Sequence, residues 1–232
     1  MFRRGGFHPE SLSESKTIGK PALRSMRSQF RILQEIIVQS AYMNTIALDL
    51  HSVIDLTDEQ FFMLCQHNRD LKFERTAKGK IVIMPPTAWG TGNRNIKLST
   101  RLEIWAECDN TGIAFDSSTG FILPNRAIRS PDAAWVRQER IEAINPDPDK
   151  FLPIAPDFVV ELMSASDMLE DVQAKMREYI ENGVRLGWLL EPKQQYVEIY
   201  RQEREVEVLS SPTTLSGEDI LPGFVLDLQG IL

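Results

Sequence analysis

The stretch that decides the fold of this chain is Pro156-Asp157-Phe158-Val159-Val160-Glu161-Leu162-Met163. An apolar run of this length, followed by a helical pattern, predicts a buried strand. Glu161 lies inside that run, where a carboxylate is costly to desolvate unless it is paired or binds a cation. Glu161 is therefore either a functional group or a glutamate at an exposed edge or strand end.

A second carboxylate opens another strand-like run, Ser130-Pro131-Asp132-Ala133-Ala134-Trp135-Val136. Side chains alternate between the two faces of a strand, so Asp132 is expected to share a face with Ala134 and Val136. By the same alternation, Glu161 shares a face with Val159 and Met163. The plainer interpretation of Asp132 is a Ser-Pro-Asp turn that enters the strand.

An amphipathic helix is predicted over residues 168–182, with Asp167 as N-cap and Gly183 at its C-terminal end. At about 100° per residue, Leu169, Val172, Met176, Tyr179 and Ile180 form one apolar stripe. Lys175 falls on the border of this stripe. Its stem can lie along apolar surface and bring the amine over a nearby site, or the amine can simply reach water.

The remaining pattern predicts helices and strands on both sides of these elements. We expect a short helix capped by Thr57, a hairpin of 71–75 and 81–84 with a turn at Lys78-Gly79, and a helix over about 91–108. Further strands are expected at 113–116, 120–123 and 186–190, and a second hairpin at 196–200 and 205–209. This order predicts an α/β fold with a mixed central β-sheet flanked by helices and with added β-hairpins.

Composition limits the chemistry that this domain can perform. The chain has 232 residues, 42% of them apolar and 25% charged, which is typical of a globular protein. Cys65 and Cys108 cannot make a disulfide framework and favour a cytoplasmic protein with reduced thiols. His8, His51 and His67 all precede residue 70. We therefore expect carboxylates, lysine or a hard cation to do the work of the core domain, rather than a histidine base or a His/Cys zinc site.

Charge separates residues 1–42 from the rest of the chain. The first 42 residues hold seven Lys/Arg against three Asp/Glu, a net of +4, and the remaining 19 against 30 give −11. The segment 1–42 is expected to be disordered or a non-native extension upstream of Met43, or else a basic tail for an acidic partner. Residues 43–232 are expected to form a single domain. The acidic balance argues against nucleic-acid binding without excluding it.

An ordered series of short motifs resembles the PD-(D/E)XK nuclease superfamily and, more closely, the Uma-type putative restriction-endonuclease family of cyanobacteria. The resemblance covers roughly residues 55–228. It rests on the runs that hold Asp132 and Glu161 and on these further stretches: Phe115-Asp116-Ser117-Ser118-Thr119-Gly120-Phe121, residues 164–167, Lys175-Met176-Arg177-Glu178-Tyr179, and Asn182-Gly183-Val184-Arg185-Leu186-Gly187-Trp188.

The resemblance implies a restriction-endonuclease-like core that cleaves phosphodiesters. Asp132 and Glu161 would hold a divalent ion, Mg²⁺ or Mn²⁺ in its place, with the Leu162 carbonyl as a further ligand. The catalytic residues would be Asp132, Glu161 and a lysine that stabilises charge on the phosphate. In the superfamily this lysine lies two residues after the acid, where Met163 stands here. Lys175 resembles a lysine that has migrated to the neighbouring helix.

Two kinds of function follow from these residues. The first is a metal-dependent endonuclease acting on nucleic acid, with DNA as the expected substrate, and fold analogy suggests a homodimer. The second is a catalytically inactive protein that keeps the nuclease fold as a nucleic-acid- or protein-binding module, which Met163 favours. Glu74 and Glu103 are candidates for an additional acid, although each is also typical of a surface glutamate. No membrane span is expected, because no stretch reaches about 20 apolar residues.

Overall fold

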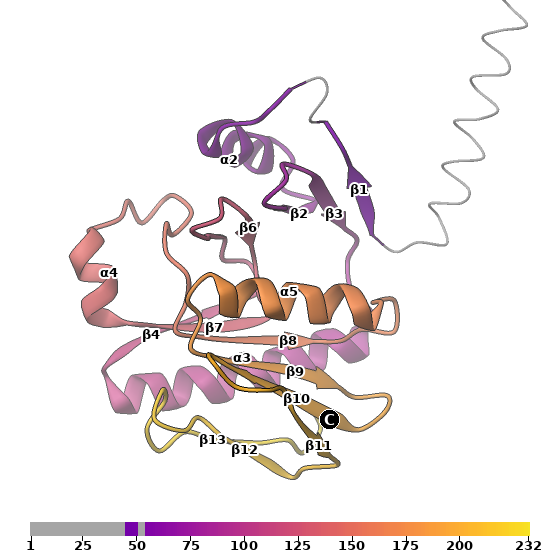
Figure 1. The fold of residues 1–232 in the computed structure, drawn as a ribbon, viewed down its shortest axis with the longest axis vertical. Coiled ribbons are helices and arrows are strands. Elements are labelled where there is room, and N and C mark those ends of the chain that lie inside the picture. The colour runs from indigo at the N-terminus through magenta and orange to yellow at the C-terminus, as the bar shows by residue number, and fades with distance from the viewer. Residues whose placement is uncertain (1–44, 51–53) are drawn as a thin grey trace, which may run out of the picture. The chain divides into compact units, whose positions relative to one another are not determined.

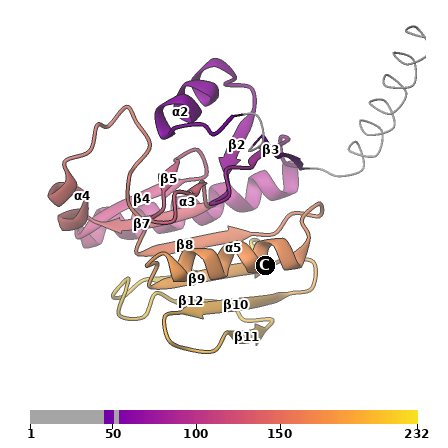
Figure 2. The ribbon, with the colours of Figure 1, turned by 45° about the horizontal axis from the view of Figure 1, so that its top comes forward.

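The computed structural model describes residues 45–50 and 54–232. The predictions for residues 1–42 lie outside the described residues. No helix in this described part of the chain is long and apolar enough to cross a membrane. Figures 1 and 2 show the fold as a ribbon.

A six-stranded mixed sheet forms the centre of the fold. Its strands lie in the order β11 (Glu207–Ser210), β10 (Tyr196–Arg201), β9 (Leu186–Glu191), β8 (Phe158–Leu162), β7 (Ala133–Arg137) and β4 (Gly112–Asp116). β8 and β9 are parallel, with Glu161 opposite Leu189, and the other neighbours are antiparallel. Since β8 is central and every residue in it is buried, Glu161 is no edge glutamate.

Two helices cover the two faces of this sheet, as Figures 1 and 2 show. α3 (Trp89–Asp109) packs with its apolar residues Leu98, Leu102 and Ala106 against one face, which also contacts the C-terminal hairpin of β12 (Thr214–Ser216) and β13 (Val225–Asp227). α5 (Leu169–Glu181) covers the other face through its buried Met176 and Tyr179. The mixed α/β architecture with added hairpins is therefore confirmed.

A smaller five-stranded sheet lies beside the α5 face. Its strand order is β1 (Ile46–Leu48), β3 (Ile81–Met84), β2 (Lys72–Arg75), β6 (Ile128–Arg129) and β5 (Phe121–Ile122). The predicted hairpin is present, with β2 and β3 antiparallel and Gly79 in its turn at φ 78°. The predicted Thr57 cap is also present: Thr57 and Gln60 form a reciprocal capping box at the start of α2 (Asp58–His67).

Some predicted boundaries are wrong. Met168, not Asp167, occupies the N-cap of α5, without a side-chain cap. The Asp167 carboxylate instead accepts a hydrogen bond from the Ser164 N–H at 2.7 Å, within the loop before the helix. The short helix α4 (Gln138–Ile144) was not predicted, because none of its residues is buried and its apolar pattern is weak.

Candidate active site

The strand alternation places Glu161 under α5. Val159 and Met163, two residues on either side of Glu161, belong to the apolar cluster that contains Met176 and Tyr179 of α5. The Tyr179 hydroxyl donates to Glu161 Oε1 at 2.9 Å. The predicted face of β8 is thus the observed one, and the carboxylate meets polar groups from the helix that covers it.

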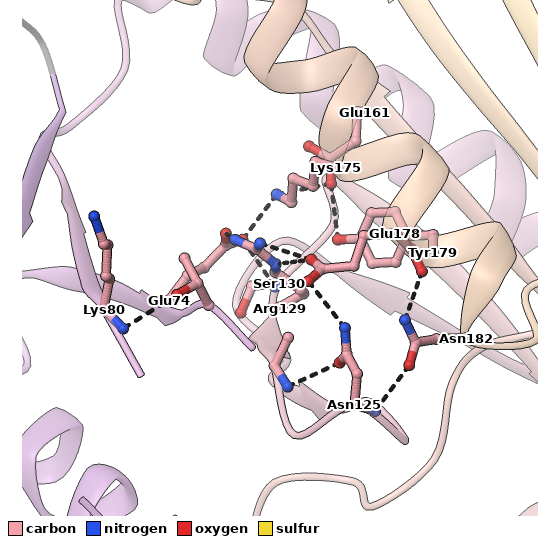
Figure 3. A network of polar contacts seen from close by, with 12 residues as sticks. Glu74, Lys80, Asn125, Arg129, Ser130, Glu161, Lys175, Glu178, Tyr179 and Asn182 are labelled. Atoms are coloured by element: carbon pink, nitrogen blue, oxygen red, sulfur yellow. Dashed lines mark hydrogen bonds and ion pairs between the residues drawn. The ribbon is translucent and has the colours of Figure 1, made fainter. Parts of the chain in front are cut away.

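Lys175 reaches the carboxylates rather than open water. Its Nζ lies 2.8 Å from Glu161 Oε1 and 2.8 Å from Glu74 Oε1, and its side chain is only 15% exposed. Figure 3 shows the amine between these two groups. The prediction that this border lysine delivers its amine to Glu161 from the helix therefore agrees with the geometry. Met163, two residues after Glu161, is buried in the apolar cluster beneath α5.

Glu74 is a buried member of this network, not the surface glutamate that one interpretation of the sequence favoured. It lies on β2 and is 3% exposed. Arg129 Nη1 donates to Glu74 Oε2 at 3.0 Å, and the Ser130 N–H donates to Oε1 at 3.0 Å. The Arg129 guanidinium also binds Glu178 of α5, with Nη2 2.6 Å from Oε2. The other candidate, Glu103, is exposed on α3.

Asp132 is held at the entrance to β7 by two donors from different elements. Its Oδ2 accepts from the Leu162 N–H of β8 at 2.8 Å, and its Oδ1 accepts from Asn95 Nδ2 of α3 at 3.0 Å. The residue does precede the strand, as the turn interpretation supposed. Its carboxylate nevertheless ties β7 to β8 next to Glu161, which a local turn residue would not do.

The carboxylates of this site outnumber the cationic side chains that neutralise them, and Lys175 serves both Glu74 and Glu161. Burial alone raises the pKa of Glu74, but the Lys175 and Arg129 charges outweigh it and lower that pKa to about 2. For Glu161, burial together with the neighbouring Asp132 and Glu74 charges outweighs Lys175 and raises the pKa to about 7. Both directions follow from Lys175 being shared, because Glu74 has Arg129 as a second cation, whereas the described residues give Glu161 only the Tyr179 hydroxyl besides Lys175.

Burial also raises the pKa of Asp132, against the opposing effect of the Lys72 charge and the Leu162 N–H. The same charges keep Lys175 protonated: burial disfavours its ammonium, but Glu161 and Glu74 more than compensate and raise its pKa above the ordinary value. Two carboxylates with raised pKa values, beside a lysine that stays charged, form an electrostatic setting that a divalent cation would relieve.

The donor set fits a hard cation. Among the described residues, Oε1 makes both polar contacts of Glu161, which leaves Oε2 free to bind an ion. Each Asp132 oxygen accepts one hydrogen bond and retains a lone pair. No group of three or more His, Cys, Asp or Glu side chains suited to a metal ion occurs among the described residues. Neutral oxygens would therefore have to complete the coordination shell, as Mg²⁺ allows through bound waters.

Other polar residues near the site have ordinary structural roles. Asp116 Oδ1 accepts from the backbone and hydroxyl of Ser118, so it caps the turn after β4. Arg129 is an internal partner of Glu74 and Glu178. Asn95 contacts Asp132 and Tyr179 contacts Glu161. Neither contact was predicted, because an asparagine or a tyrosine in a sequence does not indicate an active site until the fold shows its neighbours.

Known proteins resemble this chain at two levels. The model of the family Uma2, described as "Putative restriction endonuclease", matches residues 58–229. Among solved structures, a putative nuclease of DUF820 from Anabaena variabilis has the same fold, with a TM-score of 0.63 and 18% sequence identity over 76% of this chain and 97% of that one. No curated protein matches. The predicted restriction-endonuclease-like fold is confirmed by these findings.

Proposed function

We propose, from the premise that this chain belongs to the Uma2 family of putative restriction endonucleases, that it is a metal-dependent endonuclease. Its reaction would be the hydrolysis of phosphodiester bonds in nucleic acid, with DNA as the substrate. The observation that carries the proposal is the position of Lys175. Its ammonium lies 2.8 Å from Glu161 Oε1, although the superfamily's usual lysine position is taken by the buried Met163.

The proposed chemistry divides between the acids and the lysine. Asp132 and Glu161 would hold Mg²⁺, or Mn²⁺ in its place, with the Leu162 carbonyl as the further ligand already inferred from the family resemblance. When bound, such a cation supplies charge neutralisation and a more acidic water. Hydrolysis forms a bond from a water oxygen to phosphorus and breaks one bridging P–O bond, whose oxygen leaves with a proton.

Lys175 would stabilise the negative charge that grows on the phosphoryl oxygens as this bond forms. An ammonium in a site with little water does this more strongly than one in solution, because solvent screens it less. Glu74 and Arg129 would keep the amine in place, since Glu74 binds it from β2 and Arg129 clamps Glu74. Loss of the lysine should therefore affect turnover more than substrate binding.

The test is cleavage of supercoiled plasmid, linear duplex DNA, single-stranded DNA and RNA with Mg²⁺ or Mn²⁺. Wild type is compared with Asp132→Ala and Lys175→Ala, and with the exposed-site controls Glu103→Gln and Lys193→Ala. We expect a rate loss of about 10²–10³-fold for Lys175→Ala and at least as much for Asp132→Ala. The two controls should behave as wild type. Equal activity in all five proteins would contradict the proposal and point to contamination or a different site.

A catalytically inactive binding module is the second candidate, and the burial of Met163 at the usual lysine position favours it. It predicts that wild type binds DNA, or a protein partner, without cleaving any substrate at any Mg²⁺ or Mn²⁺ concentration. A homodimer and a cytoplasmic location stay predictions from fold analogy and cysteine usage. Sedimentation velocity of the purified chain tests the first.

A further inference from the structure

The side-chain oxygen of Asn95 is a buried acceptor that the described residues leave without a hydrogen bond. Two other buried side-chain atoms in the described part of the chain share this condition, the indole nitrogens of Trp135 and Trp188. Both indoles belong to the apolar cluster under α3, whereas Asn95 contacts Asp132 at the candidate site. A buried acceptor without a donor is costly, so this atom calls for a partner that the described residues do not supply.

The orientation of the Asn95 amide is fixed by its neighbour. A carboxylate that binds a cation is ionised and can only accept, so in that state the atom that faces Asp132 Oδ1 at 3.0 Å must be the Asn95 nitrogen. Flipping the amide would place Asn95 Oδ1 against Asp132 Oδ1, and the amide oxygen would still have no donor. Asn95 Oδ1 is therefore an acceptor that this arrangement keeps available beside Asp132.

The second carboxylate oxygen of Asp132 accepts its hydrogen bond from a different element. Leu162 N–H donates to Oδ2 at 2.8 Å, so Asp132 is oriented by β8 and by α3 together. Carboxylates that bind metal ions are commonly oriented by such hydrogen bonds. Because the described part of the chain offers too few acids near this point to fill a coordination shell, a cation here would keep waters, and those waters are hydrogen-bond donors.

We propose that Asn95 is a positioning residue for the divalent cation. Its Nδ2 orients the Asp132 carboxylate, and its Oδ1 accepts a hydrogen bond from the hydration shell of the ion. The inference rests on the proposed function, because it requires the cation that Asp132 and Glu161 would hold. It gives α3 a role in the site, although the family resemblance placed all the proposed ligands just before β7 and on β8.

The test measures Mn²⁺ binding by calorimetry, together with the rise in melting temperature that Mn²⁺ causes. Asn95→Ala is compared with wild type and with Asn93→Ala, a matched control that is exposed on the same helix. We expect Asn95→Ala to weaken Mn²⁺ binding about 10-fold or more, as loss of such supporting groups typically does. Asn93→Ala should bind as wild type does.

A second variant separates metal positioning from structural support. Asn95→Asp places a second carboxylate against Asp132, so it should lower the melting temperature in EDTA. It keeps oxygens that accept from the hydrated ion, so Mn²⁺ should raise its melting temperature by more than it raises that of wild type. A purely structural role predicts lower melting temperatures in EDTA for both Asn95 variants and an Mn²⁺ affinity equal to that of wild type.

The outcomes also separate this inference from the proposed function. If wild type binds Mn²⁺ and Asn95→Ala binds it equally well, the role of Asn95 is wrong and the cation site stands. If wild type and Asp132→Ala both fail to bind Mn²⁺ at millimolar concentration, the cation site and the inference built on it are both overturned.

Discussion

The two faces of the six-stranded sheet are built from alternate residues of the same strands, and they differ in kind. Under α3, the strands place Phe158, Val160 and Trp188 in one apolar cluster. Under α5, β8 places Glu161 and β10 places Glu198, which bind Tyr179 and Gln173 of the helix. The α3 face can supply the stability that the buried charges of the α5 face cost. Stability and chemistry are therefore expected to respond to different substitutions.

The largest expected loss of stability comes from the apolar face. Trp188→Ala removes a fully buried ring that packs edge-on against Phe158 at 4.7 Å between ring centroids. We expect a loss of about 4 kcal/mol in the free energy of unfolding, measured by urea denaturation. Val208→Ala, at an exposed position on β11, should change it by less than about 0.5 kcal/mol. The rate of cleavage per folded molecule should be the same in Trp188→Ala as in wild type. A lower rate would contradict the claim that the two faces respond to different substitutions.

Glu74→Gln should cost about 3 kcal/mol, because it leaves Lys175 and Arg129 buried against one fewer negative charge. The effect falls below that of Trp188→Ala, since glutamine keeps one oxygen that can accept from Lys175 or from Arg129, which contact different oxygens of Glu74. Urea denaturation beside the exposed control Glu107→Gln measures it. A cost within error of the control would show that the α5 face does not depend on this ion-pair network.

Glu161 should make the metal-free protein less stable as pH rises. Its pKa is about 7 in the folded protein against an ordinary 4.5, so the folded state binds the proton more tightly than the unfolded state. Stability should therefore fall as pH increases from about 4.5 to about 7 and level off above it. Glu161→Gln removes this dependence, so its stability relative to wild type should increase across the same window. Parallel pH profiles of the two proteins in EDTA would contradict the electrostatic account.

The smallest effect is expected from Tyr179→Phe, which removes the hydroxyl that donates to Glu161 at 2.9 Å and keeps the ring in the apolar cluster. A loss of about 1–2 kcal/mol is expected for a buried hydrogen bond to a carboxylate. Tyr196→Phe is the control, since no hydrogen bond of its hydroxyl is found among the described residues. If both substitutions cost the same in thermal or urea unfolding, the Tyr179 contact adds nothing to the site.

The sequence predicted the local parts of this site because each has a short-range signal. The apolar run around Glu161, the alternation on β7 and β8, and the stripe beside Lys175 all depend on neighbours within a few residues. Together they placed the amine and one carboxylate on facing elements, as the structure has them. The Thr57 cap and the β2–β3 hairpin were predicted for the same reason.

The long-range partners left no such signal. Lys175 and Glu74 are separated by 101 residues, and Glu74 had the appearance of a strand residue on a solvated face. Its burial follows from the packing of the smaller sheet beside α5. Asn95 likewise gains meaning only when α3 meets the start of β7. The N-cap error at Asp167 has a different cause, because a nearby Ser164 N–H competed successfully for its carboxylate.

The most direct test of the cation site is a crystal grown without metal and soaked in MnCl₂, with anomalous diffraction to locate the ion. The account predicts an Mn²⁺ peak about 2.0–2.2 Å from carboxylate oxygens of both Asp132 and Glu161, absent from crystals of Asp132→Ala. At saturating Mn²⁺, no peak between these two carboxylates, or a peak that persists unchanged in Asp132→Ala, would contradict it.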